Sequence, residues 1–361
     1  MNDANELISF IASMSGEGNL RVEENLGEGY VRLRVSEAER RQAKHDIQHV
    51  EDIVIEMLRN ARDAGADKVY LATTKEEGVR TLLFLDNGSG VPQDMQERIF
   101  DARVTSKLES MKMDRWGVHG RGMALFSIKQ NTDEARVVTS SVDLGSAFKV
   151  CVATDRLGER ADQSSWPQAV KDDDGRYVCA RGPHNIIRAA CEFALEELRC
   201  CDVYLGSPSE IAATLYAQAS SRLDTSRLLF IDDECELPVI DRLGLASDAE
   251  DFIRICSGLG LEMSERTAHR ILSGQIKPVR GVTARLLRER DSTSHAPAPV
   301  DLAKDRRGLR IAKDDMAQFS RAVERDFNDL AARYYLNLCG DPKIRVSRDR
   351  ITVTFDLAKE E

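Results

Sequence analysis

A carboxylate and an amide one helical turn apart are the first candidates for chemistry in this sequence. Glu56, Asn60 and Asp63 stand at positions i, i+4 and i+7, so a helix would carry all three on one face. The amide oxygen is a hard ligand that suits Mg²⁺, and the carboxylate can take a proton from water. Apolar residues form the stripe that anchors this helix to a core: Ile53, Val54, Met57, Leu58 and Ala61.

A second candidate is an acid at the end of an apolar run. Asp86 follows the run from Leu82 to Leu85, which predicts a buried strand that ends at the carboxylate. An isolated acid in that position can accept a hydrogen bond from an amino group such as that of adenine. Gly88 and Gly90 let the chain bend and let a flat ring approach the backbone.

The third candidate is a glycine-rich stretch before a helix. Gly117, Gly120 and Gly122 precede a helical run that reaches Ile128. Free N–H groups and the helix dipole favour phosphate there. Each of the three signals alone is common in proteins without such a site, but the ordered trio can serve a single ligand.

Taken together, these motifs resemble those of the GHKL superfamily of ATPases, which includes gyrase B, the heat-shock chaperone member, histidine kinases and MutL. Glu-x-x-x-Asn-x-x-Asp-Ala is similar to the first family motif, Asp-x-Gly-x-Gly to the second and Gly-x-x-Gly-x-Gly to the third. Gly145-Ser146-Ala147-Phe148 is similar to the last motif. Asp63-Ala64-Gly65-Ala66 and Thr105-Ser106-Lys107 most resemble the MutL-type and type IIB topoisomerase branches. The resemblance covers about residues 40 to 155.

The resemblance implies ATP and Mg²⁺ as ligands and assigns roles by position. Glu56 corresponds to the general base that activates water, Asn60 to the Mg²⁺ ligand, and Asp63 to a further nucleotide-site residue. Asp86 corresponds to the adenine reader, with Ser146 as its hydroxyl helper. The segment 100–116 is in the expected position of an ATP lid. The remaining binding positions fall in the glycine turn, this lid and the phosphate loop: Gly88, Gly90, Thr105, Lys107, Gly117, Gly120 and Gly122. Lys107 would reach the phosphates from the lid, or else be an exposed lysine on a mobile loop.

These assignments favour a Mg²⁺-dependent ATPase whose lid closure gates the docking of protomers or of a partner protein, with a homodimer formed on ATP binding. An alternative is a nucleotide-gated DNA-binding or regulatory protein with slow or no hydrolysis. A protein kinase is a weaker hypothesis, because the nearest phosphoacceptor candidates, His45 and His49, are expected on the surface of the leading helix.

Composition limits the class of protein. The 361 residues suffice for two or three domains, and 42% hydrophobic with 31% charged residues indicate a globular protein. The formal net charge of −10 argues against a general coat for nucleic acid, though not against a local basic patch. No apolar run is long enough for a membrane span, and the first residues lack the basic start of a signal peptide. Eight cysteines without CxxC spacing favour reduced thiols and a cytoplasmic location.

The predicted fold class is α+β, with a Bergerat-type α/β sandwich over residues 1–155 that has strands on one side and helices on the other. Its expected helices begin near Glu37 and cover about 46–64 and 123–128, with strands at 68–72, 80–85, 135–140 and 147–153. A small α/β extension is expected over 156–245. The stretch 154–181 is loop-rich, and further elements follow it: helices 186–198 and 208–220, and strands 202–205 and 228–231.

The rest of the chain is predicted to be mostly helical. Within the segment 246–290, Ser264 to Gly274 resembles the second helix of a helix-turn-helix. Residues 264–290 hold seven Lys or Arg against two Glu, so this segment could bind DNA or could be a solvated basic face, and the two are about equally favoured. A linker is predicted at 291–312 and a long helix at 313–337. A C-terminal hairpin of 344–346 with 351–355 completes the segment 313–361.

Overall fold

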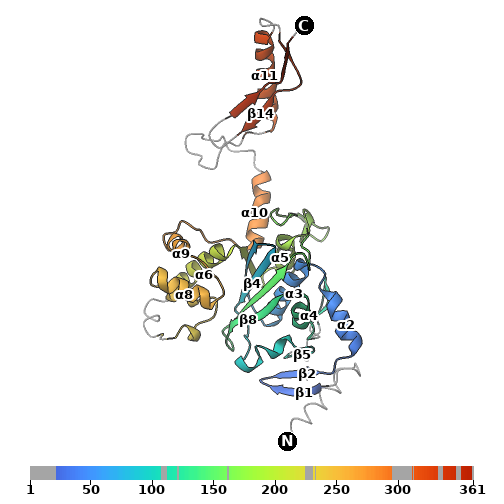
Figure 1. The fold of residues 1–361 in the computed structure, drawn as a ribbon, viewed down its shortest axis with the longest axis vertical. Helices are drawn as coiled ribbons and strands as arrows, with labels where there is room; N and C mark the ends of the chain where they lie inside the picture. Colours follow the sequence, from blue (N-terminus) through green and yellow to red (C-terminus); the bar gives the residue numbers. More distant parts are fainter. Residues whose placement is uncertain are drawn as a thin grey trace. The chain divides into compact units, whose positions relative to one another are not determined.

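The computed structural model describes residues 22–106, 112–119, 122–160, 162–223, 231, 233–294, 311, 313–331, 336–346 and 351–359 (Figure 1). The chain divides into two compact units, Met1–Arg290 and Asp291–Glu361. Lys107, Gly120 and most of the strand expected at 228–231 lie outside the described residues. The sequence-based division into five segments stays a prediction.

A five-stranded sheet in the order β12-β3-β4-β9-β8 forms the centre of the N-terminal unit (Figure 1). β12 pairs with β3 in parallel, with Val203 opposite Val69, and the other neighbours are antiparallel. Asp86 lies opposite Ser146, so the last residue of one strand meets the first of the next. The strands are β3 (Lys68–Glu76), β4 (Val79–Asp86), β8 (Glu134–Ser140), β9 (Ser146–Ala153) and β12 (Asp202–Gly206).

Both faces of this sheet are buried, and successive residues of a strand contribute to opposite faces. In β4, Leu82 and Phe84 belong to one hydrophobic cluster, whereas Leu83 and Leu85 belong to the other. A strand that is buried on both sides reads as a continuous apolar run, which explains the sequence before Asp86.

Helices pack on the first face of the sheet, and the first three of them in chain order line the site described below. Ser36 and Glu39 form a capping box that starts the first of them. Nine of the fourteen residues of the second are buried, so it is the most enclosed helix of this face. These helices are α2 (Glu37–Asp46), α3 (Val50–Asp63), α4 (Ala124–Asn131) and α5 (Ile186–Glu196).

A second helical layer covers the opposite face, which the two-layer sandwich predicted from the sequence did not include. It consists of α6 (Pro208–Arg222), α8 (Ala249–Gly258) and α9 (Glu265–Leu272). Phe252 and Ile271 from these helices lie in one cluster with Tyr70 and Leu85 of the sheet. The α+β class is confirmed, but the N-terminal unit has helices on both sides of its sheet.

Smaller elements complete the N-terminal unit. The hairpin β10–β11 lies inside the stretch that was predicted to be loop-rich, and the helix predicted from residue 46 begins only at Val50. His49 precedes it with extended backbone, and its N–H donates to Asp52 Oδ2 at 2.9 Å.

The minor strands are β1 (Val22–Gly27), β2 (Tyr30–Leu33), β5 (Val104–Thr105), β6 (Lys112–Asp114), β7 (Gly117–His119), β10 (Gln168–Lys171) and β11 (Tyr177–Arg181). Short 3₁₀ turns are η1 (Gln93–Met95), η2 (Arg98–Phe100), η3 (Glu234–Glu236) and η4 (Arg242–Leu245).

In the C-terminal unit a long helix accompanies two short antiparallel strand pairs. The predicted pairing of 344–346 with 351–355 is confirmed, since Ile344 lies opposite Val353. The predicted extension of the helix to residue 337 was wrong, because it ends at Ala331 and Asn337 belongs to a strand. The elements from residue 282 onward are α10 (Val282–Ser294), α11 (Lys313–Ala331), β13 (Leu336–Leu338), β14 (Lys343–Val346), β15 (Ile351–Thr354) and β16 (Leu357–Lys359). Among the described residues no helix combines the length and the apolar character that a membrane crossing requires.

Candidate functional site

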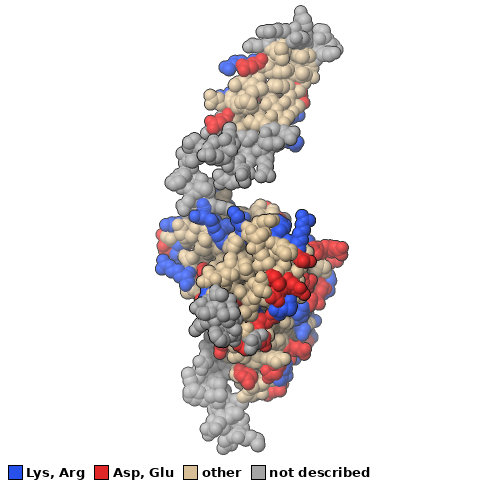
Figure 2. Space-filling view, turned by 90° about the vertical axis from the view of Figure 1, so that its left-hand side faces the viewer, with Lys and Arg blue, Asp and Glu red and all other residues tan. Residues whose placement is uncertain are grey.

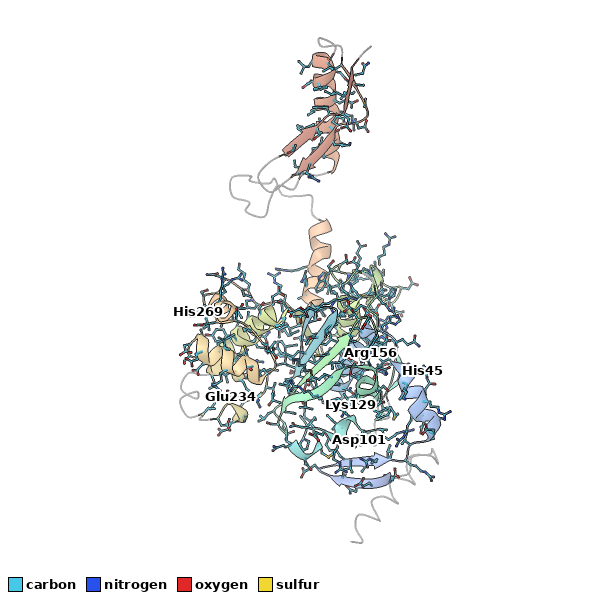
Figure 3. The ribbon with its side chains drawn as sticks, in the orientation of Figure 1. His45, Asp101, Lys129, Arg156, Glu234 and His269 are labelled. Carbon is cyan, nitrogen blue, oxygen red and sulfur yellow. The ribbon has the colours of Figure 1, made fainter. Side chains whose placement is uncertain are left out.

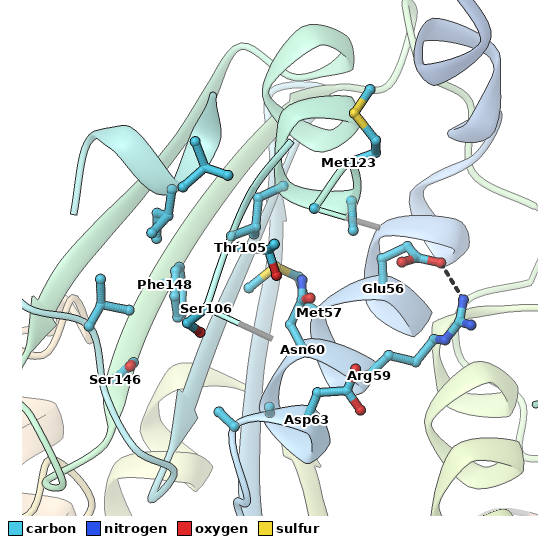
Figure 4. Close-up of a pocket in the computed structure, with 18 of the residues that line it drawn as sticks. Glu56, Met57, Arg59, Asn60, Asp63, Thr105, Ser106, Met123, Ser146 and Phe148 are labelled. Carbon is cyan, nitrogen blue, oxygen red and sulfur yellow. Dashed lines mark hydrogen bonds and ion pairs between the residues drawn. The ribbon is translucent and has the colours of Figure 1, made fainter. Parts of the chain in front are cut away.

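One face of α3 opens onto a cavity of about 480 Å³ in the N-terminal unit (Figure 4). Glu56, Asn60 and Asp63 are the residues of this helix face that line the cavity without being fully buried. Their spacing places them one helical turn apart. A volume of this size falls within the range of about 300–1,000 Å³ that small-molecule sites occupy.

A buried carboxylate borders the cavity at the end of β4. Asp86 is only 4% exposed, and its Oδ1 accepts a hydrogen bond from the Gly88 N–H at 2.8 Å. Ser146, opposite Asp86 in the sheet, lines the same cavity. A carboxylate is an acceptor only, so this end of the cavity suits a ligand group that donates a hydrogen bond.

Two glycines hold the backbone close around Asp86. A Cβ added to Gly90 would lie 1.9 Å from the Ser141 carbonyl oxygen, and one added to Gly145 would lie 2.1 Å from that of Asp86. Both glycines also have positive φ, +70° and +87°. Only glycine fits such positions, so the loop around the carboxylate depends on them.

A hydroxyl pair next to Asp86 orients the Ser146 side chain. The Ser140 Oγ donates to the Gly145 carbonyl at 3.0 Å and accepts from the Val91 N–H at 2.7 Å. The Ser146 Oγ lies 2.9 Å from it. Because the single Ser140 proton is already used, Ser146 must donate in this pair, which leaves Ser146 its acceptor lone pairs. Ser140 was not a candidate from sequence, because it belongs to none of the motifs.

An N-terminal strand supports the side of the cavity where the sequence predicts a lid. β2 pairs with β5, with Val31 opposite Thr105, and Tyr30, Thr105 and Ser106 line the cavity. Burial raises the pKa of the Tyr30 hydroxyl, although a hydrogen bond with Ser106 acts in the opposite direction. The phenol therefore stays neutral at physiological pH. Tyr30 was not a candidate from sequence, because its strand shows no motif.

The glycine-rich stretch is divided between two elements. Gly122, with φ of +67°, lines the cavity just before α4, and its carbonyl accepts from the Arg103 N–H at 2.8 Å. Gly117 instead lies in β7, opposite Asp114, and is not among the lining residues; nor is Gly88. Of the residues chosen from sequence, the cavity thus brings together Glu56, Asn60, Asp63, Asp86, Gly90, Thr105, Gly122 and Ser146.

A cluster of charged side chains adjoins the helix face. The Arg59 Nη1 donates to Glu56 Oε1 at 2.7 Å (Figure 4). The Arg59 Nε donates to Asp114 Oδ2 at 3.0 Å. Arg62 bonds Asp63 at 2.9 Å and the same Asp114 oxygen at 3.1 Å. Glu56 is thus held by a cation while it lines the cavity.

The donor set fits a magnesium ion that takes most of its ligands from elsewhere. Asn60 lines the cavity, and its amide oxygen is the atom that would hold the ion. The buried Nδ2 of the same amide has no hydrogen-bond partner among the described residues, so it could donate to a phosphate oxygen beside the ion. Within the same residues no three His, Cys, Asp or Glu side chains gather as a metal site. Mg²⁺ commonly keeps waters and phosphate oxygens with only one or two protein ligands, which this site can supply.

A basic surface lies on α9, on the other side of the sheet. The helix buries Ala268 and Ile271 and exposes Arg266, His269 and Arg270. Figure 3 marks His269 on this helix, and its side chain is 65% exposed. Figure 2 views the N-terminal unit from this side and shows Lys and Arg side chains gathered on the upper part of the face.

Comparison with known proteins identifies the class of this site. Residues 47–152 match the family described as histidine kinase-, DNA gyrase B- and HSP90-like ATPases. The N-terminal unit therefore contains an ATPase domain of the GHKL type, which belongs to an ATP-binding family. The matched segment includes Glu56, Asn60, Asp86 and Ser146, all of which line the cavity.

The curated relatives are DNA mismatch repair proteins called MutL. That of Brucella abortus (strain S19) is 34% identical over 112 residues, which cover 31% of this chain and 18% of the relative. That of Pediococcus pentosaceus is 31% identical over 115 residues, covering 31% and 17%. The similarity thus spans less than a fifth of these relatives' length.

Proposed function

We propose that this chain binds ATP with Mg²⁺ and hydrolyses it to ADP and phosphate. The observation that carries the proposal is the convergence of Glu56, Asn60 and Asp86 on one nucleotide-sized cavity. These residues come from two different elements, α3 and the end of β4. The match of residues 47–152 to a family of ATPases supports the same ligand.

The polar groups of the cavity divide into two sets that suit the two ends of ATP. Asp86 and Ser146 offer acceptors to the adenine amino group, and the Gly90 backbone lies beside them. Glu56, Asn60 and Asp63 border the region where the triphosphate would lie. Gly122, before α4, and Thr105, from the lid, would border the phosphates, and Gly117, Gly120 and Lys107 stay predictions for the same role.

Glu56 is the proposed general base. Its carboxylate accepts a proton from water as the water oxygen attacks the γ-phosphorus and the bond to the bridging oxygen breaks. Asn60 would hold Mg²⁺ through its amide oxygen, and the ion would neutralise charge on the phosphates. Asn60 and Glu56 are one helical turn apart, so a single helix positions both.

The lid is the proposed link between nucleotide and partner. Because β5 pairs with β2, a change in lid order would be transmitted to the N-terminal strands. We propose that ATP-bound lids favour docking of a second copy or of a partner protein. Cysteines such as Cys151, Cys200 and Cys256 are free thiols, which supports the proposal of a cytoplasmic location.

The decisive experiment compares wild type with Glu56→Gln. The variant should bind a non-hydrolysable ATP analogue with affinity within about threefold of wild type, while turnover falls by about 10²–10⁴-fold, the usual contribution of a positioned base. Calorimetry gives the affinity and phosphate release gives the rate. Undiminished turnover would remove the assignment of Glu56, and absence of analogue binding to wild type would remove the function itself.

A second candidate function is DNA binding through α9. The specific observation is that Arg266, Arg270, Lys277 and Arg280 are all exposed within a segment of net formal charge +5. Clustered cations attract phosphate backbones, and the attraction weakens steeply with salt.

Fluorescence anisotropy with duplex DNA tests this candidate. Arg266→Ala/Arg270→Ala should weaken binding at low salt by about tenfold or more and leave ATP turnover unchanged. Arg254→Ala on α8 is the matched control, since Arg254 is 59% exposed but pairs with Glu234 at 2.7 Å. Wild-type protein that binds no DNA at low salt would exclude this function.

A further inference from the structure

Arg59 joins the proposed base to the hairpin β6–β7. Its side chain is 3% exposed and lies between Glu56, at 2.7 Å from Nη1, and Asp114, at 3.0 Å from Nε. Glu56 belongs to the same helix, whereas Asp114 comes from the hairpin 55 residues further along the chain. One guanidinium thus holds a cavity-lining carboxylate and a distant segment at the same time.

The hairpin is fixed to the helices chiefly around Asp114. The other carboxylate oxygen of Asp114 accepts from the backbone N–H of Trp116 at 3.0 Å. The Trp116 ring stacks on the ring of Phe193 in α5, with centroids 6.2 Å apart. Arg115 lies 3.4 Å from Glu192 of the same helix. Asp114 therefore contacts the arginines of α3 when the hairpin packs against α3 and α5, which we call the seated hairpin.

Arg62 provides an internal comparison, because it shares Asp114 but not Glu56. Its guanidinium bonds Asp63 at 2.9 Å, Asp114 at 3.1 Å and Glu197 at 3.0 Å, and it is 8% exposed. Both arginines anchor the hairpin to α3. Only Arg59 also touches the proposed base.

A buried guanidinium needs anionic partners, and its fork geometry links the directions of its bonds. While Asp114 occupies the Nε side, Arg59 is steered and partly neutralised by the hairpin. Without Asp114, Arg59 would lose one anionic partner and would hold Glu56 more tightly in their existing ion pair, which competes with proton transfer from water to that carboxylate. The seating of the hairpin therefore controls how Glu56 is held.

We propose that Arg59 is a positioning residue for Glu56 and couples the seating of the hairpin β6–β7 to ATP hydrolysis. The proposal rests on the proposed function. It treats Asp114 and Arg59 as one unit, so removal of either partner disturbs the same step. Arg59 also lines the cavity, but its guanidinium bonds carboxylates there, so ATP binding is expected to persist when it is replaced.

The test is a double-mutant cycle in the full chain, with kcat and KM for ATP measured for each protein. Arg59→Gln and Asp114→Asn should each lower kcat by about tenfold or more and change KM by less than about threefold. The double variant should be no slower than the slower single variant, because the two residues act as a unit. Arg59→Lys should not restore kcat, since one ammonium cannot replace the fork.

Arg62→Gln is the matched control. It removes a bond to the same Asp114 oxygen and should lower thermal stability to a similar extent, but kcat should stay within about threefold of wild type. Three outcomes would each overturn the coupling. They are a loss of kcat in Arg62→Gln equal to that in Arg59→Gln, losses of kcat that multiply in the double variant, and a normal kcat in Arg59→Lys. If Arg59→Gln does not fold, Asp114→Asn, which keeps both arginines, decides through its kcat alone.

Failure of this proposal differs from failure of the proposed function. If Glu56→Gln abolishes turnover while Arg59→Gln and Asp114→Asn leave turnover intact, only the proposed coupling is overturned. Wild-type protein without turnover, or Glu56→Gln with full turnover, overturns both.

Discussion

Replacing Asp86 by Asn isolates the contribution of one carboxylate oxygen to nucleotide affinity. The side chain is 4% exposed, and its Oδ1 accepts from the Gly88 N–H at 2.8 Å. Asparagine has nearly the same shape and keeps one oxygen for that amide. The other carboxylate oxygen becomes an NH₂ group, which donates and cannot accept.

The expected loss follows from what the amino group of adenine would meet. It would exchange a hydrogen bond to a charged acceptor for contact with another donor. Hydrogen bonds to charged groups contribute about 1.5–3 kcal/mol, which corresponds to roughly 10- to 150-fold in the dissociation constant. Stability should change by less than about 1 kcal/mol, because the Gly88 amide stays paired.

Calorimetric titration with a non-hydrolysable ATP analogue measures this loss. Asp67→Asn is the matched control, since Asp67 accepts from Asn87 at 2.6 Å beside the same turn but does not line the cavity. Its affinity should equal that of wild type. An Asp86→Asn protein that binds within about threefold of wild type, or an equal loss in Asp67→Asn, would refute the adenine role.

Two further predictions concern stability. Gly145→Ala should lower the free energy of unfolding by about 2–5 kcal/mol in urea titrations, because the new methyl would lie 2.1 Å from the Asp86 carbonyl oxygen at a φ of +87°. Gly78→Ala is the control, since Gly78 has positive φ but no atom within 4 Å of an added Cβ, and it should cost only about 1–2 kcal/mol. Equal losses in the two variants would contradict the clash at Gly145. Burial raises the pKa of Glu159, but hydrogen bonds from Arg80 and Lys75 outweigh it and hold that pKa below its usual range. The stabilisation is therefore present above the unfolded-state pKa of about 4.3 and is lost as pH falls through the lower folded-state pKa. Arg80→Met removes this stabilisation, so the difference in unfolding free energy between wild type and Arg80→Met should become smaller at acid pH. A difference that stays constant down to about pH 2 would contradict the role of the Glu159 carboxylate.

Local signals made much of the site predictable from sequence. The spacing of Glu56, Asn60 and Asp63 specifies a helix face whatever the helix packs against. Ser36 and Glu39 form a capping box from neighbouring residues, so the start of α2 was also predictable. Asp86 after an apolar run marked the end of a buried strand, where the structure has it.

Long-range pairings were not predictable, because no local pattern encodes them. The run in β4 indicates burial on both faces, but not that α6, α8 and α9 cover the second one. Tyr30 enters the cavity because β2 pairs with β5, more than 70 residues away. Glu56 and Arg59 are neighbours on one helix, yet the link of Arg59 to Asp114 needs the folded hairpin.

The parallel pairing of β12 with β3 has a consequence for how this module can be cut. Sequence similarity ends near residue 152, whereas the outer strand of the sheet arrives only at Asp202–Gly206. A fragment trimmed to the homologous stretch would expose the backbone of β3 along Val69 and Leu71, an open edge that invites aggregation. The segment that resembles other proteins is therefore shorter than the segment that completes the sheet, and an expression fragment should include β12.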